Sequence, residues 1–342
     1  MPQAARARRL RRLTVLALGV TTALTLSACA AGDDRDGADT PTPSASPSTA
    51  PRGLLTKAEA KKAVDNYEKI NNRANANQDV KLLGSVEAGQ IYEQSSADFE
   101  QWETWSEKEQ KHYESAFFYR DREYLIPAVD SGASWFAVKA HTSAAPKAGS
   151  ALVVFDKVDG AYKVVMTVYS DEALPEIAVD EHGYVTPADP SQKVGGLAPD
   201  ALSKSYEDFF ETGGKTAGKT FAETKSSKGS IEVFKGGVDK DLRGYATEKF
   251  FAKEPAHPKV YALRLKNGGA VALFPTAHTS EMILKPRYMS GFDITPGPKE
   301  AVYDGSRRDV VTDEFEGQAL AVLSPKAKPQ VTGIEYALVD SR

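Results

Sequence analysis

The sequence holds one cysteine, Cys29, at the point where an apolar segment gives way to polar sequence. Without a second cysteine the chain can form neither an intramolecular disulfide nor a cysteine zinc site. An unpaired thiol is also an odd group to keep in an oxidising compartment. The position of this thiol therefore indicates a chemical role, and the folded part must be held together by its apolar core.

The residues before Cys29 have the pattern of an export signal. Five arginines between Arg6 and Arg12 precede an apolar run over 13–26, which is typical of a secretory signal peptide over residues 1–28. An uncleaved transmembrane anchor would need about 20 apolar residues, so this run is too short for one. The pair Arg11-Arg12 loosely resembles a twin-arginine export signal, but the general secretory route is favoured.

The segment ends in Leu26, Ser27, Ala28 and Cys29. This ending resembles the lipobox of bacterial lipoproteins. The resemblance implies that the sulfur of Cys29 takes a diacylglyceryl group, that the peptide is cut just before it, and that the mature chain is held on the extracytoplasmic face of the cell membrane. A plain secretory signal that leaves Cys29 unmodified is the alternative.

Charge and composition limit the partners. Removing residues 1–28 takes away five arginines and no acid, so the net charge moves from −4 to −9. An acidic chain is a poor match for nucleic acid, whose phosphates require a basic footprint. It also disfavours electrostatic docking on anionic lipids, so we expect attachment through the lipid on Cys29. Residues 29–53 are rich in Pro, Ser, Thr and Asp, which predicts a disordered, extended tether.

A run of glycine, lysine and threonine resembles a phosphate-binding loop. Gly213–Thr220 matches the pattern G-x-x-x-x-G-K-[ST], but such a loop must follow a buried strand and open a helix. Here an amphipathic helix over Ser205–Glu211 precedes the loop, and the polar sequence after it shows no helical stripe. We therefore expect a flexible Gly/Lys loop between two helices, with no nucleotide bound and no cofactor.

Two histidines occupy matching sequence contexts. His141 lies in Ala140–Ser143 and His278 in Ala277–Ser280, each expected at the end of a strand. Paired histidines could bind a metal or supply a general base. Because no carboxylate or second histidine stands at ligand spacing near either one, we expect a shared turn and no metal site.

An aromatic stretch with interspersed acids could recognise sugars. Trp102 and Trp105 could stack on glycans of the cell wall, or could face the core together, since they are one helical step apart. The acids Glu100, Glu103, Glu107 and Glu109 could include a glycosidase pair. Their mixture with Lys108 and Lys111 favours a solvated face.

The apolar spacing predicts the elements that position these groups. Thr56–Glu59 is a capping box before a helical stripe from Ala60 to Ala74, and a second helix is expected from Asp79 to Gly89. Ser96–Tyr119 is expected to be helix and then strand. Further strands are predicted at Trp135–Val138, Leu152–Phe155, Tyr162–Tyr169 and Glu176–Val179, with Asp159-Gly160 as a hairpin turn.

The second half repeats this plan. After Gly195-Gly196, Pro199 begins a helix, and five strands are predicted at Val260–Leu265, Ala270–Phe274, Met282–Leu284, Gln318–Leu323 and Ile334–Val339. Tyr67-Glu68 lies 139 residues before Tyr206-Glu207, and the two histidine motifs are 137 residues apart. Two matches at nearly the same offset indicate a duplication.

Helices followed by an antiparallel sheet, twice, give an α+β class with two domains, 54–194 and 195–342. This plan resembles the cone-shaped nuclear transport factor 2-like fold in tandem, and the tether with Cys29 resembles uncharacterised actinobacterial lipoproteins. That fold hosts enzymes as well as binding modules. We expect a non-catalytic module that binds a ligand or protein partner in the cell envelope. The alternatives are a wall- or glycan-directed hydrolase and a structural accessory of a membrane complex.

Overall fold

The computed structural model describes residues 52–143, 149–238 and 242–342. Contacts divide the chain into two units, residues 1–49 and 50–342. The predicted signal peptide, the lipobox with Cys29 and nearly all of the predicted tether lie outside the described residues. No helix in the described part of the chain is long and apolar enough to cross a membrane.

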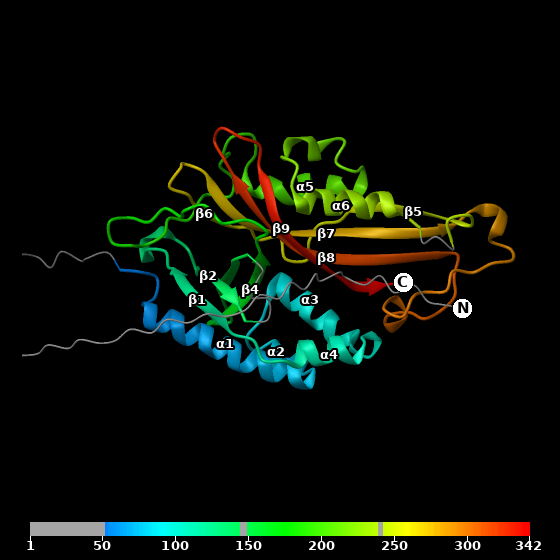
Figure 1. Ribbon diagram of the computed structural model, residues 1–342, viewed down its shortest axis with the longest axis horizontal. Coiled ribbons are helices and arrows are strands. Elements are labelled where there is room, and N and C mark those ends of the chain that lie inside the picture. The colour runs from blue at the N-terminus through cyan, green and yellow to red at the C-terminus, as the bar shows by residue number, and fades with distance from the viewer. Residues whose placement is uncertain (1–51, 144–148, 239–241) are drawn as a thin grey trace, which may run out of the picture. The chain divides into compact units, whose positions relative to one another are not determined.

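Helices and two antiparallel sheets alternate along the described chain (Figure 1). The first half consists of α1 (Lys57–Asn77), α2 (Val80–Leu83), α3 (Gly89–Glu100), α4 (Glu107–Glu114), β1 (Tyr119–Leu125), β2 (Trp135–Thr142), β3 (Ala151–Val158) and β4 (Ala161–Tyr169). The second half consists of α5 (Leu202–Glu211), α6 (Lys225–Gly236), β5 (Ala246–Ala252), β6 (Tyr261–Arg264), β7 (Ala270–Leu284), β8 (Val310–Leu323) and β9 (Gln330–Ser341). The expected α+β class is confirmed.

The helix starts follow local chemistry where capping residues are present. Helix α1 has the predicted capping box, in which Thr56 N donates to Glu59 Oε2 (2.7 Å). The single helix predicted from Asp79 to Gly89 is wrong, because α2 ends at Leu83. Residues 86–88 instead pair with β4, where Ala88 N donates to Val164 O (2.9 Å). This tertiary pairing overrides the helical propensity of the segment.

The first sheet is an antiparallel meander in the order β1-β2-β3-β4. Its hairpin turn at Asp159-Gly160 is confirmed, with φ of 52° and 83° at the two residues. Positive φ at both central positions is the signature of a type I′ turn. The strand predicted at Glu176–Val179 is wrong, since this segment makes only isolated bridges, at Ile177 and Val179.

The second sheet has the order β5-β7-β8-β9, and β6 also pairs with β7. Strands β5 and β6 occupy opposite ends of β7 on the same side, so together they take one position in a second meander. Strand β7 runs unbroken over 15 residues. The prediction of two separate strands here is wrong, because β8 pairs with β7 from Ala270 to Ile283.

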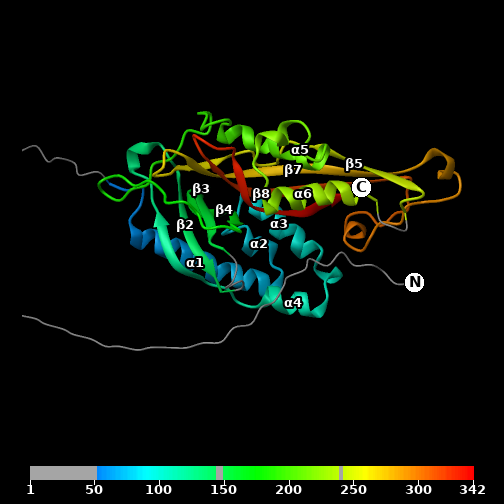
Figure 2. The same cartoon turned by 45° about the horizontal axis from the view of Figure 1, so that its top comes forward.

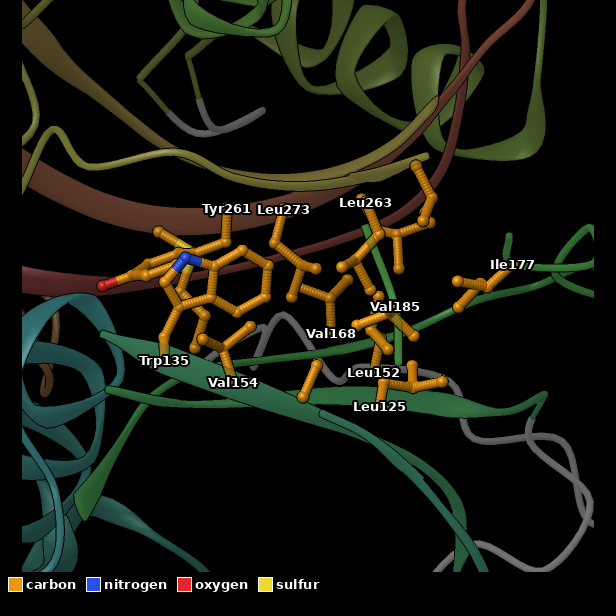
Figure 3. Packing of buried hydrophobic residues seen from close by; sticks show 14 of the residues in the cluster. Leu125, Trp135, Leu152, Val154, Val168, Ile177, Val185, Tyr261, Leu263 and Leu273 are labelled. Carbon is orange, nitrogen blue, oxygen red and sulfur yellow. The ribbon is translucent and has the colours of Figure 1, made fainter. Parts of the chain in front are cut away.

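Apolar side chains cover both faces of each sheet. One cluster lies between the two sheets and includes Leu152, Val154, Tyr261, Leu263 and Leu273 (Figure 3). A second cluster packs α1 against the other face of the first sheet. A third packs α5 against the second sheet, on the side seen in Figure 2. Together these three apolar clusters fix the two sheets so that the ends of β4 and β9 lie next to each other.

Candidate binding cleft

A cleft of about 380 Å³ lies between the end of β4, helix α6 and the edge strand β9. Its lining residues are Tyr169, Asp171, Lys225, Ser226, Gly229, Ser230, Gly333, Ile334, Glu335 and Tyr336. Small-molecule sites occupy about 300–1,000 Å³ and often lie where domains meet. A second hollow of about 400 Å³ is more open to solvent and is lined by Gly195, Gly196, Thr220 and Pro325–Pro329. The first cleft is therefore the better candidate site.

Small residues create this space. Gly229 lies inside α6, and a Cβ there would meet no atom within 4 Å. At Gly333 in β9, a Cβ would lie 2.2 Å from the carbonyl oxygen of Tyr169, so glycine is required for β9 to approach β4. The two glycines therefore have opposite effects. Gly229 leaves empty space in the cleft, whereas Gly333 allows the β9 backbone to contact the end of β4.

The cleft combines charged and phenolic groups. Lys225 Nζ lies 2.6 Å from Asp171 Oδ1, and this ion pair is largely solvent-exposed, with the Lys225 side chain 80% exposed. Asp171 is held in place because its backbone N–H donates to Thr332 O (2.7 Å). Burial raises the pKa of Tyr169 to about 12, so its phenol remains neutral at pH 7. The site can therefore hydrogen-bond a polar ligand and pack an aromatic wall against it.

One predicted residue, His278, lies directly behind this wall. Its ring is stacked between Phe210 (3.9 Å between ring centres) and Phe315 (4.9 Å), and the Tyr336 ring meets it at 67°. Burial lowers the pKa of His278 to about 3, so the imidazole is neutral. The prediction that His278 ends a strand in a turn is wrong, because it lies in the middle of β7.

The other predicted histidine is not brought to this place. His141 is exposed near the end of β2 and faces Arg120 of β1 in the strand register. Among the described residues, no group of three or more His, Cys, Asp or Glu side chains could hold a metal ion.

A buried acid accompanies His278. Glu207 of α5 accepts a hydrogen bond from Thr276 Oγ1, and its second oxygen lies 3.6 Å from His278 Nδ1. That separation is too long for a hydrogen bond. Burial raises the pKa of Glu207 to about 8. Both groups are therefore neutral at pH 7 and do not form an ion pair.

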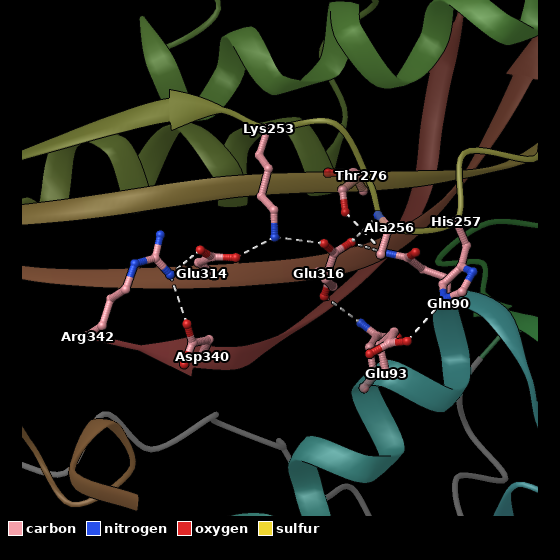
Figure 4. Close-up of polar contacts among 11 residues, drawn as sticks. Gln90, Glu93, Lys253, Ala256, His257, Thr276, Glu314, Glu316, Asp340 and Arg342 are labelled. Carbon is pink, nitrogen blue, oxygen red and sulfur yellow. Dashed lines mark hydrogen bonds and ion pairs between the residues drawn. The ribbon is translucent and has the colours of Figure 1, made fainter. Parts of the chain in front are cut away.

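Polar side chains on α3 fix the first half against the second sheet (Figure 4). Gln90 Nε2 donates to Glu316 Oε2 (2.6 Å), and Gln94 Nε2 donates to Glu316 O (3.0 Å). Lys253 Nζ bridges Glu314 Oε2 (2.5 Å) and Glu316 Oε1 (3.1 Å). No sequence pattern indicates this bridge, because the side chains that α3 buries against β8 are the amides of Gln90 and Gln94, which form no apolar stripe.

The tryptophans pack on each other instead of lining the cleft. Trp102 and Trp105 lie 5.5 Å apart between ring centres, and Tyr113 meets both rings edge-on. Both tryptophans are half-buried. The neighbouring acids Glu100, Glu103, Glu107 and Glu109 are exposed, and Glu109 caps α4 by accepting from Ser106 N (2.9 Å).

The loop that resembles a phosphate-binding loop is occupied by the protein's own carboxylate. It follows helix α5, and Asp208 accepts from the backbone N–H groups of Thr216 (2.9 Å) and Gly218 (2.8 Å). These amides are the groups that would otherwise bind phosphate. The loop lies between α5 and α6, as predicted, but it is held as a closed turn by Asp208 and is not the flexible loop that was expected.

Comparison with known proteins gives a family and one curated relative. The family described as "Domain of unknown function (DUF8094)" matches residues 51–342. An uncharacterised lipoprotein of Streptomyces coelicolor is 33% identical over 329 residues, which cover 93% of this chain and 91% of the relative. No solved structure matches the chain.

Proposed function

Because the chain belongs to the family described as domain of unknown function (DUF8094), we propose that it is a lipoprotein like its Streptomyces relative. The diacylglyceryl anchor would be on Cys29, the signal peptide would span residues 1–28, and the body would stand on the extracytoplasmic side of the membrane. Two independent features support this. They are the Leu-Ser-Ala-Cys ending and a family match that begins at residue 51, where the tether composition ends.

We further propose that the body is a non-catalytic module that binds a small polar ligand in the cleft between β4, α6 and β9. The single observation that carries this is the convergence of Lys225, Asp171 and two tyrosines around a space that Gly229 leaves open. Paired donors and acceptors beside an aromatic wall suit a ligand with one polar edge and one apolar face, such as a sugar ring.

The tandem cone-like arrangement also remains a proposal, with domains at 54–194 and 195–342. Its support is the repeated order of helices followed by a four-position antiparallel meander. The repeated Tyr67-Glu68 and Tyr206-Glu207 pairs are both buried, and each lies on the first long helix of its half. The two histidines lie on β2 and β7, which take the second position in their sheets.

A structural accessory of a membrane complex is the second candidate. The apolar packing on both faces of both sheets favours it, because a module that works through its surface needs no enclosed cavity. Crosslinking in cells followed by purification of the adducts would identify a stable partner. The exposed positions of Glu100–Glu109 give no support to the hydrolase alternative.

The binding proposal is tested by filling the cleft. The substitution Gly229→Leu adds a side chain on a helical position with open space, so we expect normal folding and at least tenfold weaker binding of any ligand in the cleft. The probes are peptidoglycan fragments and a panel of soluble glycans, titrated into the full chain by calorimetry. A hit from this panel is expected for the native chain.

Gly236→Leu is the matched control, because it lies in the same helix, has open space around its Cβ and does not line the cleft. We expect this control to bind like the native chain. Absence of any hit, or equal loss of binding in both variants, would contradict the cleft as the site.

A further inference from the structure

Strand β7 extends well beyond β6, and the end of β7 that is far from β6 is seen in Figures 1 and 2. A cluster of aromatic side chains, partly exposed, lies beside this end. The rings of Tyr245, Tyr288 and Phe292 lie 4.9–5.6 Å apart between centres. Phe292 is 50% exposed, and Tyr245 and Met289 are each 38% exposed. We call these four residues the tip patch.

The tip patch is built on a fixed base. Lys285 N donates to Tyr245 O (2.8 Å), and Phe292 N donates to Tyr288 O (3.0 Å). A small apolar core that includes Ala246, Leu284 and Ile294 lies beneath the two segments. The rings are therefore held in place while their outer faces stay in water, and this exposure of large apolar surface costs free energy unless a partner covers it.

The charges around the patch are basic. Residues 242–246 and 285–292 contain Arg243, Lys285 and Arg287 and no acid, while in the sequence Asp241 directly precedes the first segment and Asp293 directly follows the second. The Arg287 guanidinium lies 4.7 Å above the Tyr288 ring. This local excess of positive charge contrasts with a chain whose net charge is negative. The net charge alone predicts no electrostatic attraction to anionic lipids, but the cations that flank the tip patch would attract them.

We propose that the tip patch docks on an anionic phospholipid surface. Tyrosine and phenylalanine rings are favoured at the membrane interface, where an apolar ring and a polar edge meet both environments. Arginine and lysine beside them attract anionic headgroups, at about 1 kcal/mol per cation near the surface. The aromatic rings of the patch thus suit the membrane interface, and the neighbouring cations suit its anionic headgroups.

The proposed lipid anchor on Cys29 would keep the folded body close to a membrane surface. At about 3.1 Å per residue, the proposed proline-rich tether over residues 29–53 would span up to about 78 Å. A second, weak contact made by a tethered body is strengthened by effective concentration. This inference rests on the proposed function only for the presence of the membrane, since the patch itself is a property of the folded body.

The test places a reporter on the patch. In the full chain with Cys29→Ser no cysteine remains, so Ser290→Cys gives one site for an environment-sensitive fluorophore. We expect a blue shift with vesicles of phosphatidylglycerol and phosphatidylcholine, and none with phosphatidylcholine alone. The same label at Val129→Cys, another exposed position outside the patch, should not respond. This comparison separates docking of the patch from binding of the apolar N-terminal segment.

Substitutions test the charges and the rings. Arg287→Gln should weaken vesicle binding about fivefold, which is the effect of losing one interfacial cation. Phe292→Ser should weaken it as well, whereas Arg120→Gln, an exposed cation on β1, should not. An unresponsive label at residue 290, or equal shifts at residues 290 and 129, would overturn the proposal. Because Cys29 is absent, such a failure leaves the anchoring proposal unaffected.

Discussion

At the scale of single residues, the groups most capable of chemistry are buried and already have partners. His278 is stacked between two phenylalanine rings, Glu207 accepts from Thr276, and Asp208 closes its own loop. Burial holds His278 and Glu207 in their neutral forms, which removes them as a charged catalytic pair. The His278 ring instead packs against the Tyr336 ring, which lines the cleft.

Glu207 gives a pH dependence with a definite sign. Its pKa rises from 4.5 in the unfolded chain to about 8 in the fold, so the folded state binds the proton more tightly. The stability from this group is complete below pH 4.5 and is lost as the pH rises through about 8. The quantity to follow is the unfolding free energy of the native chain minus that of the Glu207→Gln variant. Between pH 5 and pH 8 we expect this difference to fall by on the order of 3 kcal/mol.

The measurement is urea unfolding of both proteins at pH 5, 6, 7 and 8. The other buried acids, including Glu87, whose pKa burial raises to about 7, are present in both proteins and cancel in the difference. A constant difference in unfolding free energy across this range would show that Glu207 does not titrate as its burial requires.

At the scale of elements, the sequence predicted what apolar periodicity and turn chemistry encode. The capping box at Thr56–Glu59 and the turn at Asp159-Gly160 are confirmed, because each is a local pattern with a local cause. Helices α3 and α6 were not predicted as they stand. Helix α6 buries Ser226, Ser227 and Ser230 in place of apolar residues, so its buried face gives no stripe.

The candidate cleft could not be predicted for the same reason. Its residues come from β4, α6 and β9, which are far apart in the sequence, and its defining feature is the empty space beside Gly229. Of the residues named from the sequence, only His278 and the repeated Tyr206-Glu207 pair lie close to the cleft. His278 packs against Tyr336, and Tyr206 hydrogen-bonds Ser230. Space between elements is a property of packing, which no single-sequence pattern records.

Helix α3 should depend on its polar bridge to β8. Gln90→Ala removes a donor to the buried carboxylate of Glu316, and we expect a loss of about 1–3 kcal/mol of unfolding free energy, since a buried acceptor loses a partner. Glu93→Ala, one turn along the same helix, breaks only a half-exposed contact with His257 and should cost under about 1 kcal/mol. Chemical denaturation of the two variants measures both. Equal losses would contradict the bridge as the specific link between α3 and the second sheet.

At the scale of the whole molecule, a proposed lipid anchor and tether precede a folded body with two proposed surface sites. The body begins where the family match begins, and the described residues carry the cleft and the tip patch. The proposed anchor would determine where those surfaces work, since a body on the extracytoplasmic face would meet envelope ligands and lipid headgroups instead of cytoplasmic substrates. The identity of Cys29 as the attachment site is therefore the claim on which the other proposals depend for their setting.

Metabolic labelling with a palmitate analogue tests that claim most directly. The full chain and its Cys29→Ser variant are expressed in a bacterial host that lipidates exported proteins, and the label on each purified protein is measured. We predict that the native chain carries the label and sediments with membranes, and that the variant does neither. Equal label on the variant, or a native chain recovered unlabelled with residues 1–28 still attached, would contradict the account.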